Sequence, residues 1–108
     1  MDIIFHVRHA AVSQRMRRRA EAAARRAASG HTRAVDAVVR FEQDGPVKRV
    51  EIVLHAPRQR DIVARGEARF FGPALATAVD KLTAQIRKLR DTRKSSKRKP
   101  RPIPVISA

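Results

Sequence analysis

The stretch RAVDAVVRFEQDGPVKRVEIVLHA, residues 33–56, decides the fold of this chain. Apolar and polar residues alternate over 33–42, which is the period of a half-buried strand. Alternation resumes over 47–56, and the segment between them contains Asp44-Gly45, a turn signal. We therefore predict a hairpin with one apolar face, formed by Val35, Ala37, Val39, Phe41, Val50, Ile52 and Leu54.

Two more strands are predicted on either side of this hairpin. Residues 3–7 alternate, with Ile3, Phe5 and Val7 on one face and Ile4 and His6 on the other. After a second turn at Pro57, residues 60–69 alternate more weakly, and their inward residues are Ile62, Ala64 and Ala68. The sequence thus predicts four strands.

Two helices complete the expected fold. Ser13 is a suitable N-cap for a helix that runs to Ala28 and ends at Gly30. Pro73 fits the first turn of a second helix. Its apolar stripe recurs at helical spacing through Leu75, Val79, Leu82, Ile86 and Leu89, and the pattern stops after Arg90.

The order of these elements is β-α-β-β-β-α. It predicts an α+β fold, a two-layer sandwich with two helices on one face of a four-stranded sheet. The other face is then left to solvent. We expect a single domain over residues 1–91, followed over 92–108 by a basic, proline-containing, disordered tail.

The composition excludes several classes of protein. The chain has no cysteine, so disulfides, thiolate metal sites and cysteine nucleophiles are absent, which fits a cytoplasmic protein. No segment approaches the roughly 20 apolar residues of a membrane helix. Trp and Tyr are missing as well, and we expect a thin core.

The net charge of +15 is concentrated on the two helices and the tail. In RMRRRAEAAARR, residues 15–26, alanines form one helical face. Five arginines form the opposite face and Arg17 lies to the side; the five are Arg15, Arg18, Arg19, Arg25 and Arg26. Solvated faces normally mix charges of both signs, whereas guanidinium groups without acids suit phosphate. We therefore predict a nucleic-acid-binding face.

The second helix and the tail add further candidates for this interface. They are Lys81, Arg87, Lys88, Arg90, Arg93 and Lys94. Because Phe5 and Phe41 are expected to point inward, the sequence offers no aromatic platform for stacking bases. The pattern favours a folded RNA that is recognised through its backbone and shape.

Other functions fit the sequence less well. We interpret His6, His9, His31 and His55 as ordinary surface residues, since none has a partner at metal-ligand spacing. Glycines are scattered singly, so a phosphate-binding loop is not indicated. We expect no catalytic residue, metal, cofactor or small-molecule substrate. An interfacial membrane helix would need larger apolar residues than the alanines of 15–26.

The order of elements, together with two motifs, resembles the ribosome hibernation promoting factor family, which includes the ribosome-associated inhibitor and is also called the sigma-54 modulation protein family. The motifs are AVDKLTAQIRKLRD at 78–91 and VSQRMRRRAE at 12–21. The resemblance covers about residues 1–91. It departs from the family at FFGPALA, residues 70–76, which lacks the usual Asp and Tyr, and Arg87 stands where members often have a neutral residue.

The resemblance implies a fold like a double-stranded RNA-binding domain and a factor that binds the small ribosomal subunit near the decoding centre. Such a factor blocks the mRNA and tRNA sites and protects idle ribosomes. By position, Arg17, Arg26, Lys81, Lys88 and Arg90 correspond to family residues that hold ribosomal RNA. It further implies a short member without the dimerisation domain, expected to be a monomer when free. The alternatives are a general RNA- or DNA-binding basic protein with the same fold and a role linked to transcription.

Overall fold

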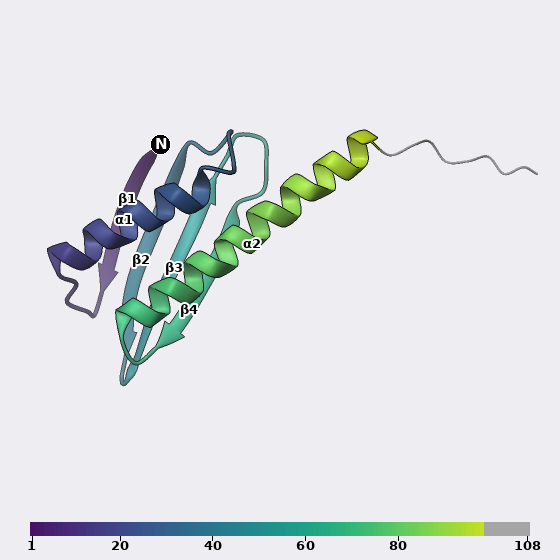
Figure 1. Ribbon diagram of the computed structural model, residues 1–108. Coiled ribbons are helices and arrows are strands. Elements are labelled where there is room, and N and C mark those ends of the chain that lie inside the picture. Colours follow the sequence, from purple (N-terminus) through teal and green to yellow (C-terminus); the bar gives the residue numbers. More distant parts are fainter. Residues whose placement is uncertain (99–108) are drawn as a thin grey trace, which may run out of the picture.

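A computed structural model of the chain describes residues 1–98, with side chains described up to Thr92. It has the predicted order of elements (Figure 1). The strands are β1 (Asp2–Arg8), β2 (Asp36–Asp44), β3 (Val47–His55) and β4 (Ile62–Ala68). The helices are α1 (Gln14–Ala28) and α2 (Phe71–Arg98).

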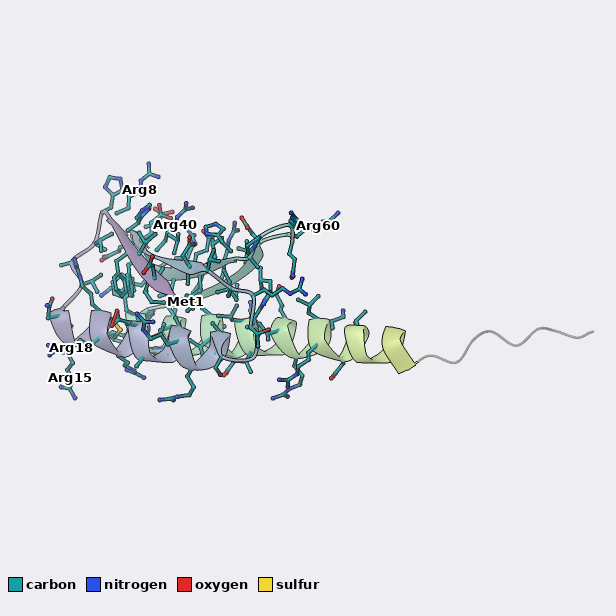
Figure 2. All side chains as sticks on the ribbon, turned by 90° about the horizontal axis from the view of Figure 1, so that it is seen from above. Met1, Arg8, Arg15, Arg18, Arg40 and Arg60 are labelled. Carbon is teal, nitrogen blue, oxygen red and sulfur yellow. The ribbon has the colours of Figure 1, made fainter. Side chains whose placement is uncertain are left out.

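The four strands form one mixed sheet in the order β1-β2-β3-β4. β1 is parallel to β2, and α1 makes the crossover between them. β2, β3 and β4 are antiparallel, and Gly45 has the positive φ of 60° that the hairpin turn between β2 and β3 requires. Both helices lie on one face of the sheet (Figures 1 and 2), so the predicted α+β two-layer architecture is confirmed.

Phe41 lies at the centre of the core. Its ring stacks on Phe5, with centroids 6.3 Å apart, and meets the edge of Phe71 at 5.3 Å. The predicted inward residues of β2, β3 and β4 are buried or packed on this core, and Leu75, Leu82 and Ile86 of α2 cover them. Phe71 is a core residue that the periodicity did not identify, because it lies before the predicted stripe begins.

The helices approach the sheet closely where residues are small. A Cβ added at Gly66 in β4 would lie 2.0 Å from the carbonyl oxygen of Ala74 and 2.8 Å from the amide nitrogen of Ala78. On α1, Ala20 and Ala24 are completely buried. Small side chains therefore set the distance between the two layers.

The predicted end of the second helix at Arg90 is wrong. α2 continues to Arg98 and crosses the predicted boundary at residue 91 without interruption. Residues 91–98 contain neither proline nor glycine, so this segment has no residue that would break the helix. The rest of the predicted tail, residues 99–108, lies outside the described residues.

The predicted end of α1 at Ala28 is confirmed: Ser29 is the C-cap, its N–H donates to the Arg26 carbonyl oxygen, and Gly30 follows. Two smaller predictions need correction. Val35 precedes β2 and is 49% exposed, so it is not a core residue. His31 is buried, not on the surface: it lies where the chain turns from α1 toward β2, and its N–H donates to the Ala28 carbonyl at 2.8 Å.

The outer face and the edges of the sheet are less uniformly charged than the sequence predicts. Ile4, Val38, Val53 and Val63 are paired in register across the four strands and form an apolar row on this face. At the β4 edge, the Gln85 side-chain amide of α2 donates to the Val63 carbonyl oxygen at 2.8 Å. This bond covers one of the backbone groups that an edge strand leaves free.

His55, at the end of β3, lies between two carboxylates. Its Nδ1 bonds to Asp36 of β2, and its Nε2 is 3.4 Å from Asp61. The hydrogen bond to Asp36 raises the pKa of His55 above its usual value of 6.5; burial opposes this shift, and the charge of Asp61 adds to it. This cluster was not predicted from the sequence, because it depends on the pairing of β2 with β3 and on the path of the chain after β3.

Gly66→Ala should destabilise the fold, because the new methyl group meets the backbone of α2 rather than a flexible side chain. Overpacking of this kind costs about 1–3 kcal/mol, which is a fall in melting temperature of at least about 4 °C for a domain of this size. Gly72→Ala is the matched control, since its Cβ would lie 3.4 Å from the flexible end of Arg19. Equal melting temperatures for the two variants would contradict the close contact.

The His55–Asp36 pair should stabilise the fold more at low pH than at high pH. Because the pKa of His55 is raised in the folded state, the contribution is complete below about pH 6.5 and disappears as the pH rises through the raised value. A double-mutant cycle with His55→Gln and Asp36→Asn, measured by denaturant unfolding at pH 5.5 and pH 9, should give a larger coupling at pH 5.5. The same coupling at both values would refute the assignment.

Candidate nucleic-acid interface

The outer side of α1 carries the predicted arginines. Ser13 fixes the start of the helix: its Oγ accepts from the Met16 N–H at 3.0 Å. The buried alanines turn one face of α1 to the core, so the arginines lie outside, with Arg15 and Arg18 on the side of the molecule away from the sheet (Figure 2). Among the described residues, Arg15, Arg17, Arg18 and Arg26 make no ion pair or side-chain hydrogen bond, which leaves their donors available.

Two of the predicted arginines lie on the flanks of α1. The guanidinium of Arg25 donates to the Met1 carbonyl oxygen at 2.7 Å and lies 3.8 Å from Glu21. Arg19 reaches toward the start of α2 near Gly72. The single five-arginine face predicted from the sequence is therefore divided. Arg25 points toward Met1, just before β1, and Arg19 points toward α2. Arg15, Arg18 and Arg26 remain at the centre of the face.

Arginines from both helices meet at a groove between α1 and α2. The groove has a volume of about 310 Å³ and is lined by Arg26, Arg87 and Arg90. Its floor is made of small or aliphatic residues, among them Ala23, Ala27, Val79 and Thr83. The lining contains no acidic side chain. Three arginines that line one open groove without an acidic neighbour form a favourable binding site for phosphate oxygens.

The other predicted residues of α2 lie elsewhere on the helix. Lys88 lines two neighbouring hollows, one with Arg87 and Asp91 and another with Gln85 and Leu89. Lys81 is exposed one heptad before Lys88, hence on the same flank, away from α1. Arg93 and Lys94 belong to the last turns of α2, and their side chains lie outside the described residues. Of the basic residues of α2, the structure therefore places Arg87 and Arg90 at the groove beside α1. Lys81 and Lys88 do not line this groove.

This groove was not predicted from the sequence. Val79, Thr83, Arg87 and Arg90 follow one another at spacings of three and four, so the sequence contained a signal that they share a flank of α2. Periodicity alone does not say which flank faces α1, because that depends on how the helices pack on the sheet.

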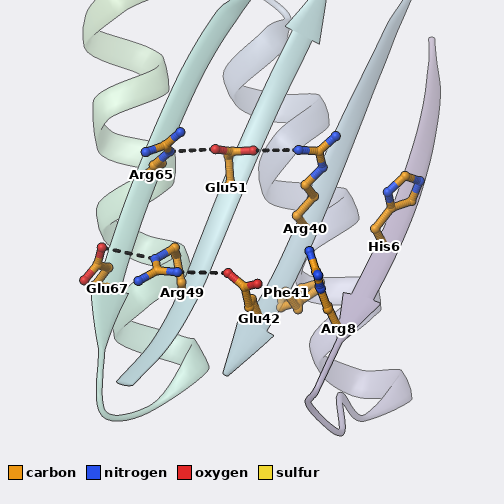
Figure 3. Close-up of a pocket in the computed structure, with 9 residues that line it drawn as sticks. All are labelled: His6, Arg8, Arg40, Phe41, Glu42, Arg49, Glu51, Arg65 and Glu67. Carbon is orange, nitrogen blue, oxygen red and sulfur yellow. Dashed lines mark hydrogen bonds and ion pairs between the residues drawn. The ribbon is translucent and has the colours of Figure 1, made fainter. Parts of the chain in front are cut away.

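On the opposite side of the sheet, most charges are already paired. Glu51 accepts from Arg65 at 2.6 Å and from Arg40 at 3.3 Å (Figure 3). Arg49 donates to Glu42 at 2.9 Å and to Glu67 at 3.2 Å, and these two hydrogen bonds raise the pKa of its guanidinium. The two sides of the protein therefore differ: cations without acidic partners predominate on the helices, and ion pairs on the strands.

Residues 1–98 contain no cluster of three or more His, Cys, Asp or Glu side chains suited to a metal ion. Within the same part of the chain, neither helix combines the length and the apolarity that a membrane crossing requires.

Two solved structures have the same fold. One, titled "Structure of an ribosomal subunit interface protein from Coxiella burnetii", superposes with a TM-score of 0.77 at 19% identity and covers 84% of this chain and 99% of that one. The other, the Protein Y N-terminal domain of Thermus thermophilus, gives a TM-score of 0.71 at 22% identity and covers 83% and 100%. No curated protein sequence matches the chain.

A family profile gives the assignment that these structures alone do not. The profile described as "Sigma 54 modulation protein / S30EA ribosomal protein" matches residues 3–94, which is most of the sequence. It confirms the resemblance found in the two helical motifs. The chain belongs to the Sigma 54 modulation protein / S30EA ribosomal protein family.

Proposed function

We propose that this protein is a ribosome hibernation factor that binds RNA of the small ribosomal subunit through its two helices. The observation that carries the proposal is the groove where Arg26, Arg87 and Arg90 converge without an acidic neighbour. Arg15 and Arg18 extend the cationic surface along the outer side of α1. Family membership and the fold shared with a protein named for the ribosomal subunit interface support this choice of partner.

The shape of this surface suits RNA backbone rather than base sequence. The cationic side chains lie on two helices that cover the same face of the sheet. Such a surface can contact the backbone phosphates of a folded RNA. Phe70 is an exposed aromatic side chain, 66% accessible, but a single ring does not form a stacking platform. The protein would therefore recognise the arrangement of phosphates in the subunit.

In this role the protein would act by occupying a site on the ribosome. Bound near the decoding centre, it would block the mRNA and tRNA sites and protect idle ribosomes, without catalysis, cofactor or small-molecule substrate. It would work in the cytoplasm and be a monomer when free. The second candidate is a general polyanion-binding protein, which the net charge of +15 by itself would support.

Co-sedimentation with separated ribosomal subunits distinguishes these two functions. We expect binding to the small subunit that persists at physiological salt and is displaced by added mRNA and tRNA. A general polyanion binder would lose most of its affinity between low and physiological salt and would bind duplex DNA equally well. That second result would overturn the proposal.

The triple variant Arg26→Gln, Arg87→Gln, Arg90→Gln should weaken binding to the small subunit by about tenfold or more. The slope of log K against log salt should fall by about 2 to 3, since each lost phosphate contact contributes about 0.7 to 0.9. The matched control is Arg33→Gln, Arg58→Gln, Arg60→Gln, which removes the same charge from exposed loop positions. Equal losses in the two triple variants would mean that only net charge matters.

A further inference from the structure

The outer face of the sheet carries two rows of charges that run across all four strands. In register, the first row is His6, Arg40, Glu51 and Arg65, and the second is Arg8, Glu42, Arg49 and Glu67. Together these side chains line a hollow of about 590 Å³ on this face (Figure 3). The charges alternate in sign from β2 to β4, so neighbours on adjacent strands attract one another.

The pairing leaves an excess of positive charge at one end of the hollow. Glu51 is shared by Arg40 and Arg65, so one carboxylate serves two guanidinium groups. In the second row, both Glu42 and Glu67 bind Arg49, while the side chain of Arg8, in register with Glu42, has no ion pair or hydrogen bond among the described residues. The partly paired Arg40 and the unpaired Arg8 both lie toward the β1 side of the sheet.

His6 lies next to these two arginines, and we call His6, Arg8 and Arg40 the cationic corner. It is in register with Arg40 on the neighbouring strand, and Arg8 is two residues farther along the same face of β1. Adjacent strands are about 4.8 Å apart and positions i and i+2 about 6.6 Å apart, so the three side chains can reach one anion. Figure 3 shows Arg8, His6 and Arg40 at the β1 side of the hollow, away from Glu67. The Arg40 side chain is 54% exposed, so the site is open to a large ligand.

We propose that His6, Arg8 and Arg40 form a second anion site that binds a phosphodiester group of an RNA strand on the face opposite the helices. Guanidinium forks match two phosphate oxygens at once, and the imidazole adds a ring N–H donor. The inference rests on the proposed function: it requires RNA around the protein on two sides. Figure 2 shows Arg8 and Arg40 on one side of the molecule and Arg15 and Arg18 on the other.

The ligand class follows from the geometry of the corner. An acidic protein segment would approach the whole hollow and meet Glu42, Glu51 and Glu67, which line the same surface. At the β1 edge, Glu42 lies in register with Arg8, but its carboxylate is bound by Arg49, and the Glu51 carboxylate is shared by Arg40 and Arg65. An RNA strand running along β1 lies two strands or more from Glu51 and Glu67, and we therefore assign the site to RNA.

The first experiment measures affinity for small ribosomal subunits. Arg8→Gln, Arg40→Gln should weaken binding about threefold to tenfold and lower the salt slope by about 0.7 to 1.8, for one or two lost contacts. The control is Arg65→Gln with Arg58→Gln, which also removes two exposed arginines, one of them a Glu51 partner on the far strand. It should change affinity less than twofold. An unchanged Arg8/Arg40 variant would overturn this inference while leaving the helical interface standing; failure of the unmodified protein to bind would instead overturn the proposed function.

The second experiment uses the free protein and two probes. In ¹H–¹⁵N spectra, hexauridylate should shift the amide signals of residues 6, 8 and 40, and the Arg8/Arg40 variant should lose these shifts while keeping the shifts on α1. A hexaglutamate peptide at the same charge concentration should cause smaller changes at this corner. Larger changes with hexaglutamate would identify an acidic protein as the ligand and refute the RNA assignment.

Discussion

The close contact between α2 and β4 at Gly66 is the constraint on which the rest of the architecture depends. A core without Trp or Tyr has little volume, and the two layers must approach each other to exclude water. Gly66 allows this on β4, and the buried alanines allow it on α1. Long cationic side chains have no room between such layers. The same small residues that close the core therefore direct the arginines outward.

The two sides of the sheet neutralise charge differently because strands and helices place side chains differently. On the strands, pairing in register sets Glu51 between Arg40 and Arg65, and distant parts of the sequence supply opposite charges. On α1, the neighbours are three and four residues away, and Glu21 is the single acid in the helix. α1 is consequently held by the packing of Ala20 and Ala24 rather than by its own electrostatics, and phosphates would relieve the repulsion among its arginines.

Much of the fold could be predicted from the sequence, because strands, turns and helix caps are marked by residues that are close together in the chain. Alternation predicted the hairpin, and Ser13 predicted the start of α1. The end of α2 was missed, since a polar sequence without proline can remain helical beyond the core. Contacts that depend on tertiary packing were also missed: the burial of His31, the cluster around His55, and the groove that brings Arg26 to Arg87 and Arg90. The cationic character of the site was predictable, whereas its geometry depends on how the two helices are set side by side.

The hydrogen bond from Gln85 to the Val63 carbonyl has a consequence for the protein in concentrated solution. Open sheets expose edge strands that can recruit further copies and grow into polymers. At β4, α2 covers the edge with this bond. One carbonyl of the β4 edge is therefore already bonded within the protein and is not available to a strand from a second copy.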